Sequence, residues 1–241
     1  MTYVIGDVHG NFSTLKDLIK SFPKKSSIIF VGDLIDRGKN SRKIVKYIRE
    51  NNYKCVLGNH ELLMINNSSD FFKKSLMDIN LKNLETWISV GGKETLLSYG
   101  LIDVVDDKIV RVSKSKYMDN FISDVKWMQS LPLYFETKQK INDKKVIISH
   151  SCISNVWKSK KDKDFEKKYK SEFIWQRDTP DKSCKIFNIF GHTKVIIPTV
   201  YDNYINIDTG CYEKNEKYGK LTAFCIENQE VICIQKNIKD E

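Results

Sequence analysis

The chain has 241 residues, of which 41% are hydrophobic and 29% are charged, and its formal net charge is +9. A compact domain of this length buries roughly 70% of the surface that its unfolded chain exposes, and a charged fraction near the globular average excludes global disorder. Neither a long apolar span nor a signal-peptide pattern occurs in the sequence, which predicts a soluble, cytoplasmic protein that does not act at a membrane.

The beginning of the chain alternates between strand and helix patterns. Short apolar runs at 2–5, 27–31 and 54–57 predict strands, each followed by a glycine. Apolar residues at helical spacing predict helices over 12–22 and 41–50. This alternation indicates an α/β protein with a polar loop at the carboxyl end of each strand.

The pattern then becomes mainly helical from residue 61 to about residue 99, with a break at Gly91-Gly92, and a further helix is expected over 117–131. A Lys-rich stretch at 158–172 is expected to be a solvated surface helix, with a docking surface for phosphorylated or anionic substrates as the minor alternative. Strands are expected at 133–137, 146–149, 186–190, 204–207, 221–226 and 231–234. Without an internal repeat or a Pro- or Gly-rich linker, residues 1–241 are predicted to form a single domain.

The loops after five of the predicted strands contain side chains that can bind metals. They are Gly6-Asp7-Val8-His9, Gly32-Asp33-Leu34-Ile35-Asp36-Arg37, Gly58-Asn59-His60-Glu61, Ser149-His150 and Gly191-His192. Glycine permits a sharp turn, and Asp-x-His places a carboxylate and an imidazole on one side of an extended segment. Because ligands of open α/β sheets collect at the carboxyl ends of strands, we expect these loops to converge.

All four histidines of the chain lie in these loops, although a single Gly-Asp or Gly-Asn dipeptide is typical of an ordinary turn. Ligands of the Asp, His and Asn types without Cys suit manganese, iron or zinc in an open site better than a structural zinc. The six cysteines are scattered without a Cys-x-x-Cys pair, and we expect reduced thiols.

Together these residues resemble the phosphoprotein-phosphatase type of metallophosphoesterase in the calcineurin-like superfamily. The nearest subgroups are the small bacterial and phage serine/threonine phosphatases of the lambda type and their diadenosine-tetraphosphatase relatives. The resemblance runs from Gly6 to Phe224 and includes Trp87-x-x-x-Gly91-Gly92, Leu131-Pro132, Trp175-x-Arg177 and Asp208-Thr209-Gly210. It implies a four-layer α-β-β-α sandwich with the metal site at the carboxyl ends of the strands.

The resemblance also implies a centre of two divalent cations, with manganese expected and iron or zinc as alternatives. The implied ligands are Asp7 and His9 for the first ion, Asp33 as the bridge, and Asn59, His150 and His192 for the second. A hydroxide activated by the two metals is expected to attack phosphorus in line, without a covalent phosphoenzyme. The helical segment 61–99 is expected to form a lid or wall over this site.

Four further residues are expected to take part in catalysis. By the resemblance, His60 is the general acid that protonates the leaving oxygen, and Asp36 holds its imidazolium by a charge-assisted hydrogen bond. Arg37 and Arg177 are expected to bind the substrate phosphate, because a planar guanidinium contacts two phosphate oxygens at once. Only five of the 40 basic residues are arginines, and this scarcity supports the assignment.

The expected activity is that of a phosphomonoesterase acting on phosphoprotein, a serine/threonine or dual-specificity protein phosphatase. His9 and Glu61 favour this subgroup, because the diadenosine-tetraphosphatases often have Gln and Asp at these positions. The alternative is a pyrophosphohydrolase of dinucleoside polyphosphates with the same two-metal site. A basic nucleic-acid-binding module with a vestigial metal site is a minor alternative. A nucleic-acid partner is not expected, because all six ligands are present and an RNP-like aromatic run is absent from the sequence.

Overall fold

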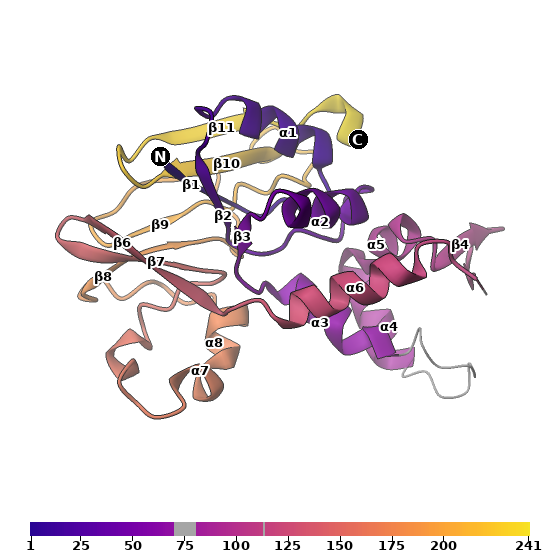
Figure 1. Cartoon of the computed structure of the whole chain (residues 1–241), viewed down its shortest axis with the longest axis horizontal. Coiled ribbons are helices and arrows are strands. Elements are labelled where there is room, and N and C mark those ends of the chain that lie inside the picture. Colours follow the sequence, from indigo (N-terminus) through magenta and orange to yellow (C-terminus); the bar gives the residue numbers. More distant parts are fainter. Residues whose placement is uncertain (70–80, 113) are drawn as a thin grey trace.

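The computed structural model describes residues 1–69, 81–112 and 114–241, and its architecture confirms the predicted α/β class. Two large sheets pack on each other, with helices on both outer faces (Figure 1), which is the implied four-layer sandwich. The first sheet contains, in spatial order, β11 (Val231–Gln235), β10 (Lys220–Cys225), β1 (Thr2–Ile5), β2 (Ser27–Phe30) and β3 (Lys54–Cys55). The second contains β6 (Tyr134–Ile141), β7 (Lys144–Ser149), β8 (Ile186–Phe190) and β9 (Tyr204–Asn206).

The strand directions bring the polar loops to one region of the molecule. Strands β1, β2 and β3 are parallel to one another, and so are β7, β8 and β9. Strands β10, β11 and β6 pair antiparallel with their neighbours. Since the carboxyl ends of parallel neighbours lie at the same edge of a sheet, the loops after β1, β2, β3, β7 and β8 leave the sandwich together.

Side chains alternate between two buried layers along the central strands. Tyr3 and Ile5 of β1 pack against the helices outside the first sheet, whereas Val4 packs against the second sheet. In β7, Val146 also lies between the sheets, and Ile147 packs toward the outer helices of the second sheet. Strands buried on both faces have continuous apolar sequences, which explains why these runs were recognisable as strands.

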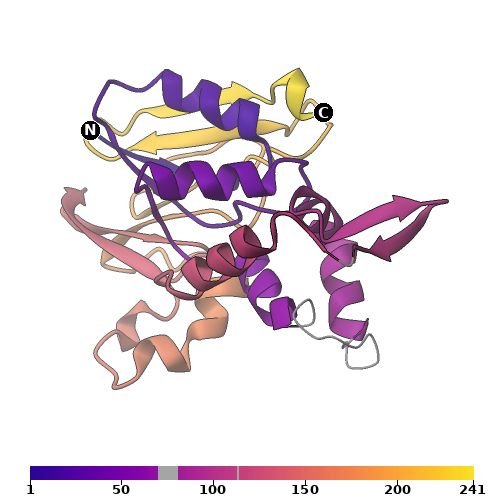
Figure 2. The same cartoon turned by 45° about the vertical axis from the view of Figure 1, so that its right-hand side comes forward.

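Helices α1 (Phe12–Lys20) and α2 (Ser41–Glu50) cover the outer face of the first sheet (Figure 2). Helix α2 has the predicted bounds. Helix α1 ends at Lys20 rather than at the predicted Phe22, whose ring instead stacks on Tyr3 at 4.0 Å.

The Lys-rich stretch differs from the predicted solvated helix. It contains η4 (Trp157–Ser159), α7 (Phe165–Lys168) and α8 (Lys170–Trp175), and α7 begins after Asp164, which has a left-handed φ of 60°. The lysines of this stretch are largely exposed, but Phe165 and Phe173 pack into the core outside the second sheet. The prediction of one surface helix was therefore wrong, because a few apolar residues anchor a broken segment.

The segment predicted to be mainly helical contains α3 (Asn59–Ser68), α4 (Leu81–Trp87), η3 (Ile88–Gly92) and α5 (Lys93–Ser98). The predicted break at Gly91-Gly92 is a kink, where Gly91 has a φ of 112°. Phe71, Phe72 and Leu76, which belonged to the predicted helical pattern, lie outside the described residues. Helix α6 (Met118–Gln129) follows and is slightly shorter than predicted. The function of this segment as a lid stays a prediction.

A two-stranded hairpin, β4 (Ile102–Val105) and β5 (Lys108–Arg111), was missed by the sequence patterns. In both views it extends away from the rest of the molecule (Figures 1 and 2). Its turn residues Asp106 and Asp107 both have a positive φ, which is usually signalled by Asn-Gly or Asp-Gly. Because most of its residues are exposed on both faces, the hairpin also lacks the alternation of apolar and polar residues that marks a half-buried strand.

Several strand bounds also differ from the predicted ones. Strand β3 is only two residues long, and β6 continues to Ile141 through an irregularity between Glu136 and Lys140. Among the described residues, the helices are too short and too polar for any of them to cross a lipid bilayer.

Candidate metal centre and active site

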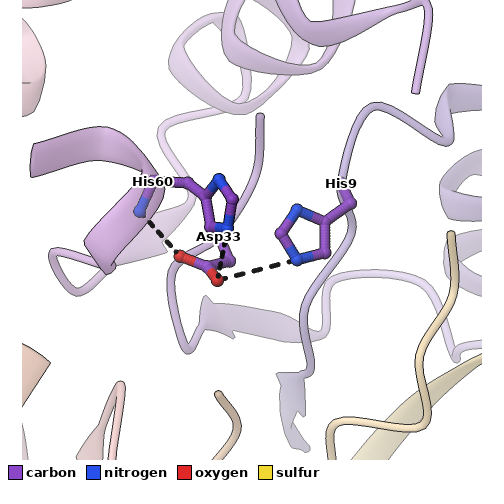
Figure 3. Close-up of side chains that lie close together, drawn as sticks. All are labelled: His9, Asp33 and His60. Atoms are coloured by element: carbon purple, nitrogen blue, oxygen red, sulfur yellow. Dashed lines mark hydrogen bonds and ion pairs between the residues drawn. The ribbon is translucent and has the colours of Figure 1, made fainter. Parts of the chain in front are cut away.

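Asp33, in the loop after β2, lies at the centre of the converging side chains. Its Oδ2 is 3.6 Å from His9 Nε2 and 3.8 Å from His60 Nε2, and its Oδ1 is 3.4 Å from His150 Nε2. Figure 3 shows the carboxylate beside both rings, with dashed lines that join it to His9 and His60. Two groups of possible ligands share this carboxylate, one with His9 and His60 and the other with His150 and His192.

Backbone carbonyls determine which nitrogen of two histidines faces the site. His9 Nδ1 lies 2.9 Å from the carbonyl of Ile35, and His150 Nδ1 lies 2.8 Å from the carbonyl of Val31. A carbonyl only accepts, so both Nδ1 atoms carry the proton and both Nε2 lone pairs point into the site. This is the tautomer that a metal-binding histidine needs, with a second hydrogen bond that fixes the ring.

The second group brings three possible ligand atoms close together, Asn59 Oδ1 and one nitrogen each of His150 and His192. The lone pair of His150 Nε2 faces Asn59 Oδ1 at 2.8 Å, and His192 Nδ1 lies 2.9 Å from the same oxygen. His192 Nε2 is buried without a hydrogen-bond partner among the described residues. Burial lowers the pKa of His150 below its ordinary value. Burial and the neighbouring His150 lower the pKa of His192 to about 3, so both imidazoles are neutral. These donors fit a divalent cation.

Asp7, at the end of β1, occupies a different position from the other expected ligands. Its carboxylate accepts a hydrogen bond from the backbone N–H of His192 at 3.1 Å, and a side chain at Gly191 would collide with it. Burial, followed by the charges of Asp208 and Asp33, raises its pKa well above the usual range. Three buried carboxylates this close need compensating positive charge, which divalent cations at Asp33 would supply.

His60 is the second residue of α3, and a buried carboxylate fixes the orientation of its ring. His60 Nδ1 donates to Asp36 Oδ2 at 2.6 Å. Asp36 is fully buried and also accepts from Trp87 Nε1 at 2.9 Å and from Thr95 Oγ1 at 2.6 Å. Burial lowers the pKa of His60, but Asp33 and Asp36 outweigh this and raise it above its ordinary value. The ring is thereby held with Nε2 toward the site.

The motif Trp87-x-x-x-Gly91-Gly92 supports both Asp36 and its neighbour Arg37. Trp87 donates to Asp36, and Gly92 packs against the Trp87 indole so closely that a Cβ would lie 2.6 Å from it. Gly91 accepts a hydrogen bond from Arg37 N at 2.9 Å, and a Cβ at Gly91 would lie 2.6 Å from Arg37 Cγ. The motif is therefore a support for the loop after β2.

Arg37 lies across the mouth of the first ligand group. Its Nη1 and Nη2 are 3.1 Å from His9 Nε2 and 3.2 Å from His60 Nε2. Its guanidinium stacks on the ring of Tyr212, with 3.9 Å between Cζ and the ring centroid. These contacts hold the Arg37 guanidinium where it can contact an anion bound in the cavity beside Asp33.

Arg177 reaches the same cavity from the opposite side but is held less tightly. It follows α8 and is exposed, and its Nη1 donates to the carbonyl of His192 at 3.0 Å. The cavity is lined by both arginines together with His9, Asp33, Asn59, His60, His192, Lys194, Asp208 and Tyr212. All ten residues expected from the sequence thus lie in or around one site, with Asp7 and His150 just beneath it and Asp36 behind His60.

Four residues of the site had no assigned role in the sequence analysis. Asp208 is buried beside Asp7, and burial with the charge of Asp33 raises its pKa to about 6. Tyr212 and Lys194 line the cavity, and Lys194 pairs with Glu213. The motif Asp208-Thr209-Gly210 signalled this loop, but only the contacts place it at the site.

Glu61 is the fourth, and its carboxylate binds backbone rather than a metal. Oε2 accepts from Asp33 N at 2.8 Å and from Gly58 N at 3.1 Å, and Oε1 accepts from Leu34 N at 2.8 Å. Burial and the charge of Asp33 raise its pKa to about 7. Glu61 therefore ties the loop after β3 to the loop after β2.

Several site residues have the left-handed backbone conformation. The φ angles are 46° at His9, 49° at Asp33, 70° at Asp36, 68° at Arg37 and 67° at His192. Asp and His adopt this conformation more readily than most residues, whereas it is strained for Arg. The sharp turns lie in the loops that bring the site residues together.

Several known proteins are similar to this chain over nearly its whole length. The chain is 28% identical to the asymmetrical bis(5'-nucleosyl)-tetraphosphatase PrpE of Oceanobacillus iheyensis, over 96% of this chain and 90% of that protein. It is 23% identical to the enzyme of the same name from Bacillus cereus, over 98% of this chain and 94% of that protein. A crystal structure of a putative diadenosine tetraphosphatase has the same fold, with a TM-score of 0.60 and 17% identity over 98% of this chain and 94% of that one.

A serine/threonine phosphatase from Saccharomyces cerevisiae also shares the fold, with a TM-score of 0.55 and 16% identity over 97% of this chain and 78% of that one. The family model described as calcineurin-like phosphoesterase matches residues 2–195, which include every residue of the two ligand groups. The chain therefore belongs to the calcineurin-like phosphoesterases, a family of hydrolases that use divalent metal ions.

Proposed function

We propose that this phosphoesterase hydrolyses dinucleoside polyphosphates such as diadenosine tetraphosphate. The observation that carries the proposal is the cationic lining of the cavity, where Arg37, Arg177 and Lys194 surround the space above Asp33. Three cations in addition to bound metals suit a substrate with several adjacent phosphates better than one with a single phosphate. The two tetraphosphatases that match nearly the whole chain support the same substrate class.

We further propose that two divalent cations bind here, with Asp33 between them. Asp7 and His9 would hold the first, and Asn59, His150 and His192 would hold the second. Manganese is the expected metal, because oxygen and imidazole ligands without thiolate suit it. When bound, such a pair supplies a nucleophilic hydroxide near neutral pH and neutralises phosphate charge.

The remaining residues would bind the phosphates and supply a proton. His60 is positioned as the general acid, because Asp36 binds its Nδ1 and leaves Nε2 to deliver a proton to the leaving oxygen. Arg37 and Arg177 contact the phosphate chain from opposite sides. Lys194, which lines the same cavity and pairs with Glu213, would add a point charge.

A phosphoprotein phosphatase is the second candidate, and it was the first expectation from the sequence. His9 and Glu61 favour it, since they match the pattern of the protein-phosphatase subgroup. Yet Glu61 binds the backbone of its own and the neighbouring loop and does not face the cavity, so its identity contributes little to the choice of substrate.

The test is manganese-dependent cleavage of diadenosine tetraphosphate beside a phosphoserine peptide, with nucleotide products separated by chromatography. We expect a higher kcat/KM for the dinucleotide and loss of turnover with a chelator. Asp33→Asn should lower kcat/KM at least about 10³-fold, because metals contribute several kcal/mol to catalysis. Asn tolerates the positive φ at this position, so the fold should persist.

Asp17→Asn is the matched control, since Asp17 is a carboxylate of α1 that bonds Asn237 and Lys20 at the surface. It should retain full activity. Preference for the peptide would establish the second candidate instead, and turnover that survives Asp33→Asn would contradict the proposed centre.

A further inference from the structure

A second cavity adjoins the metal site and shares Arg177 with it. This cavity, here called the Tyr201 groove, has a volume of about 240 Å³. Its lining includes Phe190, Val195, Ile197, Tyr201 and Tyr204 together with Arg177. It lies on the side of the second sheet, away from Arg37 and Trp87, and the mechanism proposed above makes no use of it.

The aromatic residues of the groove form a stack with an exposed end. Tyr201 lies on Tyr204 with 4.4 Å between ring centroids and an angle of 20°, and Tyr204 contacts Phe190 at 6.1 Å. Tyr201 is nonetheless 47% exposed, although one of its faces is covered by Tyr204. The exposed part of this ring can therefore accept another flat ring, and Ile197, 73% exposed, adds apolar surface beside it.

Arg177 stands where the groove meets the metal site. Its Nη1 contacts the carbonyl of His192 and Thr193 Oγ1, and Thr193 is itself part of the groove. A guanidinium at this junction can bind a phosphate that lies between the two spaces. The groove is lined by apolar and aromatic side chains on one hand and by neutral polar ones on the other, with Arg177 and Asp178 as its charged groups, whereas the metal site is lined almost entirely by polar and charged groups. The two spaces thus suit the two chemically different ends of one molecule.

We infer that the Tyr201 groove binds one nucleoside of the substrate, with the base stacked against Tyr201 and the phosphate chain passing Arg177 to the metal site. This inference rests on the proposed function and extends it by naming where the base binds. A base meets the requirements of the groove, because it offers an apolar flat face and polar edges. A phosphoserine or phosphothreonine side chain lacks a ring that would use the stack.

The experiment compares adenosine monophosphate with inorganic phosphate as inhibitors of aryl phosphate hydrolysis, in wild type, Tyr201→Ala and Tyr201→Phe. Stacking of a base on an aromatic ring corresponds to roughly 5- to 150-fold in affinity. We expect Tyr201→Ala to raise the inhibition constant of the nucleotide by this factor and that of phosphate less than about twofold. Tyr201→Phe keeps the ring and should behave as wild type. Nearly unchanged inhibition of Tyr201→Ala by phosphate excludes a loss of fold as the cause.

An equal change for both inhibitors, or none for either, would overturn the inference. Wild-type turnover of diadenosine tetraphosphate is measured in parallel and reports on the proposed function separately. If the dinucleotide is cleaved while Tyr201→Ala leaves nucleotide inhibition unchanged, the groove assignment alone is wrong. If the dinucleotide is not cleaved, the proposed function fails, and the groove assignment, which rests on it, fails with it.

Discussion

The two walls of the site differ in how firmly their residues are held. On the wall next to the first sheet, Asp36 and Trp87 are fully buried and hydrogen-bonded to each other. On the wall next to the second sheet, His150 and His192 are also buried, but beyond them Arg177 is exposed and Trp175 is 43% exposed. Groups that transfer a proton need fixed geometry, whereas groups that recognise the rest of a substrate can lie on an open surface. This second, open wall is therefore expected to tolerate substitution of its exposed residues better than the first wall does.

The largest effect is expected on the buried wall, from His60→Asn. Without a general acid, hydrolysis of an alkyl phosphate should slow roughly 10²- to 10⁴-fold, whereas an aryl phosphate with a good leaving group should lose far less. The rate loss for a dinucleoside polyphosphate should lie between those for the alkyl and the aryl phosphate, since its leaving group is a phosphate. The measurement is kcat/KM over a series of leaving groups, and an equal loss across the series would remove His60 from the role of acid.

Gly91→Ala should come next and affect both stability and activity. Gly91 has a φ of 112°, and a Cβ there would lie 2.6 Å from Arg37 Cγ. Strain in the left-handed region and overpacking together should lower the free energy of unfolding by about 2–5 kcal/mol. Displacement of Arg37 should also lower kcat/KM.

The matched control is Gly100→Ala, where φ is also positive but the nearest atom to a Cβ is Ser115 Oγ at 3.3 Å. It should lower the free energy of unfolding by only about 1–2 kcal/mol and leave activity unchanged. Urea unfolding of both variants measures this difference in the free energy of unfolding. If both lose the same stability and activity, close packing on Arg37 is not what requires glycine at position 91.

The smallest effect is expected from one substitution made on each wall. Trp87→Phe removes a buried donor to the Asp36 carboxylate and should lower the free energy of unfolding by about 1.5–3 kcal/mol. Trp175→Phe on the open wall should change it by less than about 0.5 kcal/mol. Thermal unfolding of the pair measures the difference, and equal values would show that the walls do not differ as described.

The ligand loops were predictable because local patterns mark them. Each follows a short apolar run, contains a Gly or Ser beside a polar residue, and lies at the end of a strand in a parallel array. Asp7, Asp33 and His150 could thus be expected at one place from the sequence alone. The resemblance supplied the roles, and the helical kink at Gly91 followed from its dipeptide.

The open wall was not predictable by the same reasoning. Tyr201 and Arg177 come from different segments, and their shared groove depends on the register of β8 and β9 and on how α8 packs. Glu61 was counted among metal-competent residues, but its orientation toward backbone N–H groups depends on the turn of α3. Contacts of this kind arise from tertiary packing, which a local pattern does not encode.

The left-handed residues of the site have a consequence for directed evolution. A conformation of this kind costs of order 1–3 kcal/mol for a residue that does not favour it, and Arg37, with a φ of 68°, is such a residue. Selection for heat resistance alone would favour Gly or Asn at this position, and the enriched variants would be more thermostable but less active. Screens for a thermostable form should therefore keep Arg37 and its neighbours unchanged and seek stabilising substitutions far from the site.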